Sequence, residues 1–285
     1  MNFTEHARVF GCEGEHLIGI LALPDAPLDT GVVIIVGGPQ YRAGSHRQFV
    51  LLSRALAAAG HAVLRFDYQG MGDSTGELQN FETVNPDIAC AINTLQAGAP
   101  GLRKVVLWGL CDGASAALLY CQATQDPRVG GLCLLNPWVR SEASLAKTHV
   151  KHYYRQRLKE REFWTKLLSG QVGLSALSGL FRNMKAARSP KNADSPASKL
   201  PFQGRMALAW ASFDGPILLL LSGNDYTAKE FLDHVITSAA WKGALQKGKL
   251  IEHHAPEADH TFSERKFNSV VEKCTLDLLD QTALN

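Results

Sequence analysis

The chain has 285 residues, of which 46% are hydrophobic and 20% charged, so it can bury a substantial core in one large domain or two small ones. Its formal net charge of +2 excludes a strongly basic nucleic-acid-binding protein, and no nucleic-acid partner is expected. The longest apolar run, "GPILLLLSG", is too short for a membrane-spanning helix, which needs roughly 18 uncharged apolar residues.

The cysteine spacing and the N-terminal residues both bear on the compartment. "MNFTEHARVF" lacks the basic region followed by an apolar run that is typical of a signal peptide. The cysteines are scattered along the sequence and form no Cys-x-x-Cys motif. We therefore expect neither a disulfide framework nor a zinc site. We therefore expect a reduced, cytoplasmic protein. The cysteines are Cys12, Cys90, Cys111, Cys121, Cys133 and Cys274.

Short apolar runs alternate with helical patterns along the chain. A strand, helix, strand order predicts parallel strands with helices on both faces, and strands covered on both faces should be apolar throughout. The predicted elements are strands at 6–13, 17–24 and 31–39, a helix at 45–60 starting at the N-cap Ser45, a strand at 61–67, a helix at 85–98, a strand at 104–109, a helix at 113–123, strands at 129–137 and 215–223, a helix at 228–241, a strand at 248–255 and a helix at 261–281.

A basic segment interrupts this alternation. Residues 140–205 contain 14 Lys and Arg against 4 Asp and Glu, a net charge of +10 that leaves −8 for the remainder. We predict an α/β core over 1–137 and 206–285 with a helical cap inserted at 138–205, whose end, 187–204, is loop or linker. The cap's charge could attract an anionic substrate, membrane or polymer, or simply be a solvated basic helix face. Tyr153 and Trp164 could line an acyl pocket or pack the cap against the core.

Residues 105–119, "VVLWGLCDGASAALL", predict a strand, a tight turn and a helix. Gly109 and Gly113 flank Cys111 at the spacing of a nucleophile elbow, where larger side chains would clash with the adjacent strand and helix. The helix dipole there favours a thiolate and a developing oxyanion. The alternatives are that Cys111 is merely a small buried residue, or that Ser115 is the nucleophile.

The elbow requires an acid and a histidine later in the chain, in that order. Asp225 follows the strand at 215–223, and His260 follows the last strand. Asp225 could instead be only the N-cap of the next helix. His253 and His254 compete with His260 as the base, whereas Asp259 is expected to be a loop residue.

A glycine turn, "VGGP", follows the strand at 31–39 and could supply an oxyanion hole. Pro39 has no N–H, so the predicted donors are the backbone N–H groups of Gly38 and Asp112. The alternative is an ordinary Gly-Pro turn. Arg42 and Arg47 lie just beyond this turn and could contact substrate.

With these residues placed, the chain resembles the α/β-hydrolase superfamily over nearly its full length. The pieces that carry the resemblance are "IIVGGPQ", "RFDYQGMGDSTG", "WGLCDGA", "LLSGND" and "ADHTF". In the second piece Asp67 and Ser74 have a structural role in this superfamily. "GGPQYRAGSHRQF" with a cysteine elbow is similar to the exosortase A system-associated hydrolase, type 1, which implies a bacterial cytoplasmic protein linked to exopolysaccharide production. Dienelactone hydrolases use cysteine in the same frame.

The residues together predict a Cys111–His260–Asp225 triad that cleaves an ester or thioester through a thioacyl-enzyme intermediate. The substrate would be a small molecule or an acyl carrier. Two alternatives stay open: an acyltransferase that uses the same triad, and a non-catalytic scaffold of the same fold. No metal or organic cofactor is expected, because the sequence has no ligand cluster and no dinucleotide fingerprint.

Overall fold

The computed structural model describes residues 2–38, 40–140 and 200–283. Contacts between residues divide the chain into one unit of Met1–Val139 with Leu200–Asn285 and a second unit of Arg140–Lys199. The second unit lies, apart from Arg140, outside the described residues. The predicted cap therefore stays a prediction, as do the roles of Tyr153 and Trp164.

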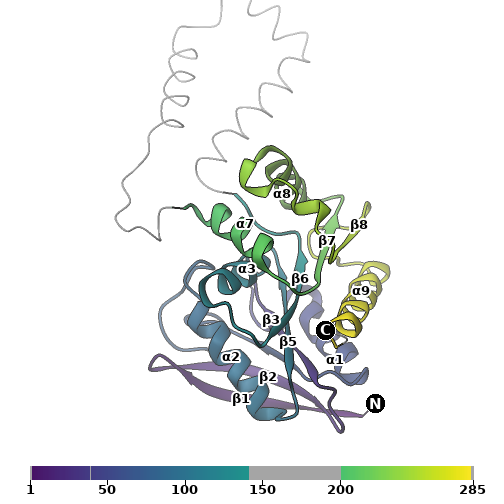
Figure 1. Ribbon diagram of the computed structural model, residues 1–285. Helices are drawn as coiled ribbons and strands as arrows, with labels where there is room; N and C mark the ends of the chain where they lie inside the picture. The colour runs from purple at the N-terminus through teal and green to yellow at the C-terminus, as the bar shows by residue number, and fades with distance from the viewer. Residues whose placement is uncertain (1, 39, 141–199, 284–285) are drawn as a thin grey trace, which may run out of the picture. The chain divides into compact units, whose positions relative to one another are not determined.

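One sheet runs through the described part of the chain, in the strand order β1-β2-β4-β3-β5-β6-β7-β8 (Figure 1). Strand β2 pairs antiparallel with both β1 and β4, and every other pair of neighbouring strands is parallel. The strands are β1 (Phe3–Cys12), β2 (Glu15–Pro24), β3 (Thr30–Ile35), β4 (Val63–Phe66), β5 (Lys104–Leu110), β6 (Val129–Leu135), β7 (Ile217–Ser222) and β8 (Leu250–Ala255).

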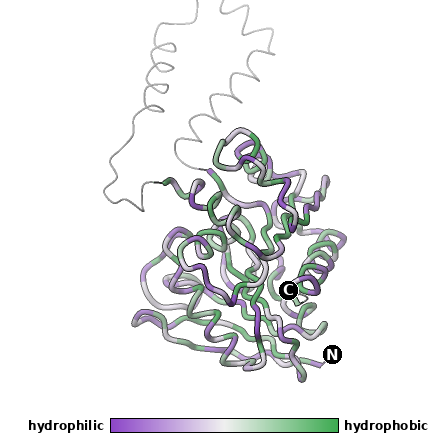
Figure 2. The backbone as a smooth tube through the Cα atoms, viewed as in Figure 1, coloured by the Kyte–Doolittle hydropathy of each residue, from purple (hydrophilic) through white to green (hydrophobic). Residues whose placement is uncertain are grey.

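The composition of each strand matches its place in the sheet. Every residue of β3, β4 and β7 is buried, as parallel strands covered on both faces require, and their apolar residues run through the interior (Figure 2). The edge strand β1 is largely exposed. It joins β2 through Glu13 and Gly14, whose φ angles of 51° and 92° make the two-residue turn that suits the twist of a hairpin.

Helices cover both faces of the sheet, with α1 and α9 packed together on one and α2, α3 and α7 on the other (Figure 1). No helix of the described residues is long and apolar enough to cross a membrane. The helices are α1 (Gln48–Ala58), α2 (Asn85–Gly98), α3 (Asp112–Thr124), α7 (Phe202–Ser212), α8 (Tyr226–Thr237) and α9 (Arg265–Ala283), with short 3₁₀ turns at η1 (Ser45–Arg47), η2 (Ala239–Trp241) and η3 (Ala244–Gln246).

Two parts of the predicted secondary structure are wrong. The helix expected from Ser45 begins at Gln48, and Ser45 does not cap it, because His46 and Arg47 take left-handed backbone angles that end the 3₁₀ turn. The expected loop near residue 204 contains the start of α7. Its prolines and small polar residues concealed a helical pattern of buried side chains, namely Phe202, Met206, Ala209 and Trp210.

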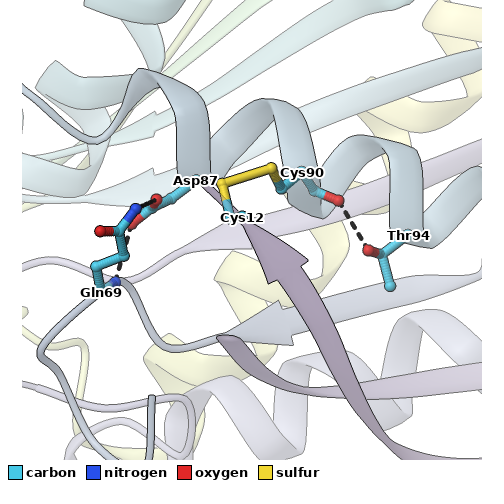
Figure 3. The surroundings of a disulfide bond; sticks show 5 residues. All are labelled: Cys12, Gln69, Asp87, Cys90 and Thr94. Atoms are coloured by element: carbon cyan, nitrogen blue, oxygen red, sulfur yellow. Dashed lines mark hydrogen bonds between the residues drawn. A yellow bond between two sulfur atoms is a disulfide. The ribbon is translucent and has the colours of Figure 1, made fainter. Parts of the chain in front are cut away.

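The cysteine prediction also needs correction. Cys12 at the end of β1 is joined to Cys90 in α2 by a disulfide, across a Cα–Cα distance of 6.0 Å (Figure 3). The two residues are 78 positions apart in the chain, so their spacing carried no sign of the pairing. A structural disulfide is typical of oxidising surroundings, which removes the cysteine argument for a reduced compartment.

Candidate active site

Cys111 lies at the turn between β5 and α3, with φ 61° and ψ −124°. Such angles are strained for a residue with a side chain and persist only where the surroundings impose them. The flanking glycines permit the turn: a Cβ on Gly109 would lie 2.4 Å from the backbone of Gly113, and one on Gly113 would lie 2.4 Å from the carbonyl oxygen of Ile35. The local sequence therefore forces a sharp strand-to-helix turn with Cys111 at its tip.

The backbone of Cys111 is fixed on both sides. Its N–H donates to the carbonyl of Leu135 at 2.9 Å, and its carbonyl accepts from the N–H of Trp138 at 3.2 Å. The Cys111 side chain is half-buried, whereas Cys121 and Cys133 are buried. Burial raises the pKa of Cys121 to about 12 and also raises that of Cys133.

Ser115, the alternative nucleophile, faces away from the turn's tip. It is fully buried, and its hydroxyl donates to the carbonyl of Trp138 at 2.6 Å. This hydrogen bond ties α3 to the chain after β6. The position of Ser115 in the structure is that of a packing residue.

His260 and Asp225 meet beside Cys111, although they come from different loops. His260 Nδ1 lies 2.8 Å from Asp225 Oδ2, and the side chain of Cys111 is close enough to the imidazole to raise its pKa. Asp225 is at the same time the N-cap of α8, since its carboxylate accepts the N–H groups of Thr227 and Ala228 at 3.1 and 3.2 Å. The two interpretations of Asp225 are therefore compatible, because separate contacts serve the helix and the histidine.

The charges of this group reinforce one another. The hydrogen bond with Asp225, followed by that with Cys111, outweighs burial and raises the pKa of His260 to about 10. Burial opposes the ionised form of Asp225, but His260 and the two N–H groups of α8 hold the pKa of this carboxyl below its usual value. At neutral pH the imidazole is therefore a cation between a carboxylate and the sulfur.

His253, His254 and Asp259 are the alternatives to the proposed base and acid, and they lie elsewhere or have other hydrogen-bond partners. His254 Nε2 lies 2.6 Å from Glu252 Oε1 on the edge strand β8, and His253 precedes it in the same strand. Asp259 accepts from the N–H and the hydroxyl of Ser263 at 2.8 and 2.6 Å, as expected of a loop residue. His260, by contrast, interacts with the side chain of Cys111, which raises the pKa of its imidazole.

The predicted oxyanion donors are close to Cys111, but one of them is in use. The N–H of Gly38 donates to Oδ1 of Asp112 at 2.5 Å. Burial raises the pKa of the Asp112 carboxyl, while hydrogen bonds from the N–H groups of Gly38, Asp112 itself and Gly113 act in the opposite direction. In this structure the side chain of Asp112 therefore engages the N–H of Gly38, and the role of the two N–H groups as oxyanion donors stays a prediction.

Arg42, which was proposed as a possible substrate contact, pairs with two acidic side chains. Its guanidinium pairs with the fully buried Asp67 and with Asp73, and its backbone N–H donates to Asp67 at 2.6 Å. Ser74 completes this loop by accepting from Ile18 and donating to the carbonyl of Asp67, each at 2.9 Å. Arg42 therefore stabilises the loop after β4. Arg47 is exposed, and its contact with substrate stays a prediction.

Asn136, which follows β6, was not predicted as part of the site. Its amide donates to Ser222 Oγ at 2.5 Å and to the carbonyl of His260 at 3.1 Å, while its oxygen accepts from the N–H of Ser222 at 2.9 Å. It is fully buried, with φ 44°, an angle that asparagine tolerates. It joins the ends of two strands to the His260 loop. The sequence signal was an asparagine at a strand end, which is too common to single out.

Among residues 2–38, 40–140 and 200–283, no group of three or more His, Cys, Asp or Glu side chains is arranged to hold a metal ion.

A mostly parallel eight-stranded sheet, helices on both faces and a strained strand-to-helix elbow define an α/β hydrolase, as predicted. The chain belongs to the hydrolase family described as "Serine aminopeptidase, S33", whose model matches residues 29–194. The family description names serine, whereas the elbow of this chain carries Cys111. The human protein ABHD12B is 38% identical over 96 residues, which are 33% of this chain and 25% of that protein. This chain thus matches only about a quarter of that relative's length.

Solved structures of low sequence identity share the fold. An esterase of Pyrococcus furiosus is 14% identical, with a TM-score of 0.63 over 98% of this chain and 90% of that one. A Butyrivibrio proteoclasticus protein with bound ferulic acid is 14% identical, with a TM-score of 0.62 over 97% and 100%. Mouse α/β hydrolase domain-containing protein 10 is 16% identical, with a TM-score of 0.59 over 96% and 98%.

Proposed function

We propose that this hydrolase cleaves an ester or thioester with Cys111 as nucleophile, His260 as acid and base, and Asp225 as the group that orients and charges the imidazole. The observation that carries the proposal is the continuous contact from the Cys111 side chain through His260 to Asp225, in which the imidazole and carboxylate lie 2.8 Å apart. A sulfur at a strained elbow, half-buried and next to a cationic imidazole, is in the surroundings that activate thiols.

The first half of the reaction forms a thioacyl enzyme. The Cys111 sulfur attacks the carbonyl carbon, and the carbonyl π electrons move to oxygen. When the oxyanion collapses, the bond to the leaving group breaks, and His260 gives that group its proton. Because the interaction with the sulfur is one cause of the raised pKa of His260, acylation of Cys111 makes the imidazole a stronger acid at that moment.

The second half releases the acyl group. His260, now neutral, takes a proton from water, and the hydroxide so formed attacks the thioester carbonyl. When the tetrahedral intermediate collapses, the carbon–sulfur bond breaks and its electron pair stays on the sulfur, while the imidazole keeps the proton that it took from water. Asp225 holds the imidazole so that its other nitrogen faces the sulfur and the water. The backbone N–H groups of Gly38 and Asp112 would stabilise the oxyanion in both halves.

The substrate class follows from the nucleophile and from the resemblance. Thiolates attack activated esters and thioesters readily, whereas amides demand stronger protonation of the leaving group, so a peptidase is the less favoured reading of the family name. Arg47 could bind an anionic part of the substrate. The link to exosortase and exopolysaccharide systems rests on "GGPQYRAGSHRQF" with the cysteine elbow. A cytoplasmic location stays a prediction, against which the Cys12–Cys90 disulfide counts.

Two other functions make different predictions for the same site. An acyltransferase would form the same thioacyl enzyme and pass the acyl group to a hydroxyl acceptor in preference to water. A non-catalytic scaffold would leave Cys111 no more reactive than a model thiol. The raised pKa of His260, next to the sulfur, favours an enzyme over a scaffold.

The test is acylation followed by intact mass spectrometry. Wild type and Cys111→Ala are incubated with p-nitrophenyl esters and acyl-CoAs, and an acyl adduct is expected on wild type alone. Iodoacetamide should alkylate Cys111 near neutral pH much faster than Cys121, Cys133 or Cys274, whose pKa values are raised chiefly by burial. Absence of an adduct together with slow alkylation of Cys111 would favour the scaffold. Added sugar acceptor or hydroxylamine then separates transfer from hydrolysis by the products formed.

A further inference from the structure

The carboxylate of Asp112 lies in the place that the proposed reaction reserves for an oxyanion. Its Oδ1 accepts the N–H of Gly38 at 2.5 Å, and the N–H groups of Asp112 and Gly113 also stabilise its charge. Gly37 makes room for it, because a Cβ there would lie 2.4 Å from this same oxygen. Backbone N–H groups that converge at the start of a helix form an anion site, and here the chain supplies its own anion.

The groups around Asp112 do not neutralise it fully. The cationic His260 attracts the carboxylate, and burial works against its charge more strongly than any other influence. The charge of Asp112 also acts on Tyr68. Burial, followed by the charges of Asp112 and Asp87, raises the pKa of the Tyr68 hydroxyl. The Tyr68 hydroxyl is buried and has no hydrogen-bond partner in the described part of the chain. Asp112 is thus a half-buried anion held mainly by backbone N–H groups beside the nucleophile.

Resting on the proposed function, we propose that Asp112 is an internal competitor for the oxyanion hole, whose side chain must leave the N–H groups of Gly38 and residue 112 before the tetrahedral intermediate can form. A neutral ground-state carbonyl cannot displace a carboxylate from such donors, since an ionised acceptor binds N–H groups more strongly. A developing oxyanion carries a comparable charge but would lie against the carboxylate, and the two anions repel. The reaction therefore depends on moving Asp112.

The experiment compares two reactions of the same sulfur. Alkylation by iodoacetamide displaces iodide at a CH₂ carbon and creates no oxyanion, so its rate reports only the reactivity of the Cys111 sulfur. Acylation by p-nitrophenyl acetate passes through an oxyanion, so its rate also depends on the oxyanion hole. The ratio of the acylation rate to the alkylation rate removes the effect of the sulfur's reactivity from the comparison. Because p-nitrophenolate leaves without needing a proton, the charge of His260 does not limit the departure of this leaving group.

Asp112→Ala keeps the backbone N–H and removes the competitor. We expect its rate ratio to exceed that of wild type by about ten-fold or more, since one freed oxyanion donor is worth at least that much. Asp112→Asn keeps an oxygen that can accept from Gly38 but lacks the charge, so its ratio should rise by a smaller factor. If the alanine variant does not fold, the rise in the asparagine variant alone decides the question.

The outcomes separate the two proposals. A ratio that is unchanged or lower in both variants, with the acetyl group still on Cys111, would overturn the role of Asp112 and leave the proposed function intact. Acetylation that persists unchanged in Cys111→Ala would overturn the proposed function, and the role of Asp112 with it.

Discussion

Asp225 Oδ2 lies 2.8 Å from His260 Nδ1, while the same carboxylate caps the first turn of α8 through Thr227 and Ala228. A single side chain thus fixes the orientation of the imidazole and the start of a helix. The substitutions that separate these two roles give the first prediction.

Asp225→Asn should lose activity and the stabilisation from the contact with His260, but keep the cap of α8. Asparagine is as good an N-cap as aspartate, whereas its uncharged amide cannot hold the imidazolium, so kcat/KM should fall about 10²–10⁴-fold. Asp225→Ala should lose the same activity, and its free energy of unfolding should be about 1–2 kcal/mol lower than that of Asp225→Asn, because the cap is gone as well. Ester hydrolysis and urea denaturation measure the two effects. Equal stability of the two variants would contradict the capping role.

His260 should make the stability depend on pH at the alkaline side. Its pKa, about 10 in the folded chain, is above the ordinary histidine value of 6.5, so the protonated form stabilises the fold. This stabilisation is fully present below about pH 6.5 and is lost as the pH rises through 10. Urea denaturation from pH 6 to 10 should show a steeper decline for wild type than for His260→Gln. If the free energies of unfolding of wild type and His260→Gln changed with pH in the same way, the pKa of His260 would not be raised by folding.

Removing the Cys12–Cys90 disulfide should destabilise the fold without slowing the chemistry at Cys111. The bond closes a loop with a sequence separation of 78 residues, and the loss of chain entropy in the unfolded state is worth about 2–4 kcal/mol. Urea denaturation with and without a mild reductant measures this for wild type, and Cys90→Ala, which cannot form the bond, should not respond to the reductant. Alkylation of Cys111 in Cys90→Ala should proceed at the wild-type rate. A reductant-independent free energy of unfolding in wild type would contradict the prediction.

Asn136 should act as a positioning residue for His260. Asn136→Ala leaves the buried N–H of Ser222 and the carbonyl of His260 without this partner, which should lower the free energy of unfolding by about 1–3 kcal/mol. Because the loop of His260 loses an anchor, kcat should fall more than KM changes. Asn136→Asp can still accept from Ser222, but it cannot donate to His260 and places an acid in a fully buried site, so neither stability nor kcat should recover. A loss of stability with an unchanged kcat in Asn136→Ala would indicate a purely structural role.

The fold could be predicted from sequence because its signals are local. The apolar run of β7 indicates a buried strand, and the glycines around Cys111 indicate a tight turn. In each case a few neighbouring residues are enough for the prediction. The missed helix α7 had a helical pattern that its prolines and small residues concealed. The disulfide could not be foreseen, since Cys12 and Cys90 meet only after the sheet and α2 have formed.

The site could be predicted in part for a similar reason. The order of Cys111, Asp225 and His260 follows from the topology of parallel strands, whose carboxyl ends share one edge of the sheet. The orientation of side chains does not follow from topology. Arg42 pairs with Asp67, and the carboxylate of Asp112 accepts the N–H of Gly38, and neither contact was predicted. Both outcomes depend on rotamers and on distant partners.

Val139 and Gln203 mark where the main chain departs from the sheet domain and returns to it, and the amide of Gln203 donates to the carbonyl of Val139 at 3.0 Å. The two points at which the chain leaves and re-enters the sheet domain are therefore neighbours in space. The contacts of the sheet domain at this place do not depend on the segment that joins the two points. An exchange of the intervening stretch for one of another length, whether by recombination or by an engineer, would leave the sheet's register and the elbow in place. The sheet domain could in this way accept inserted segments of different lengths without a change in its own fold.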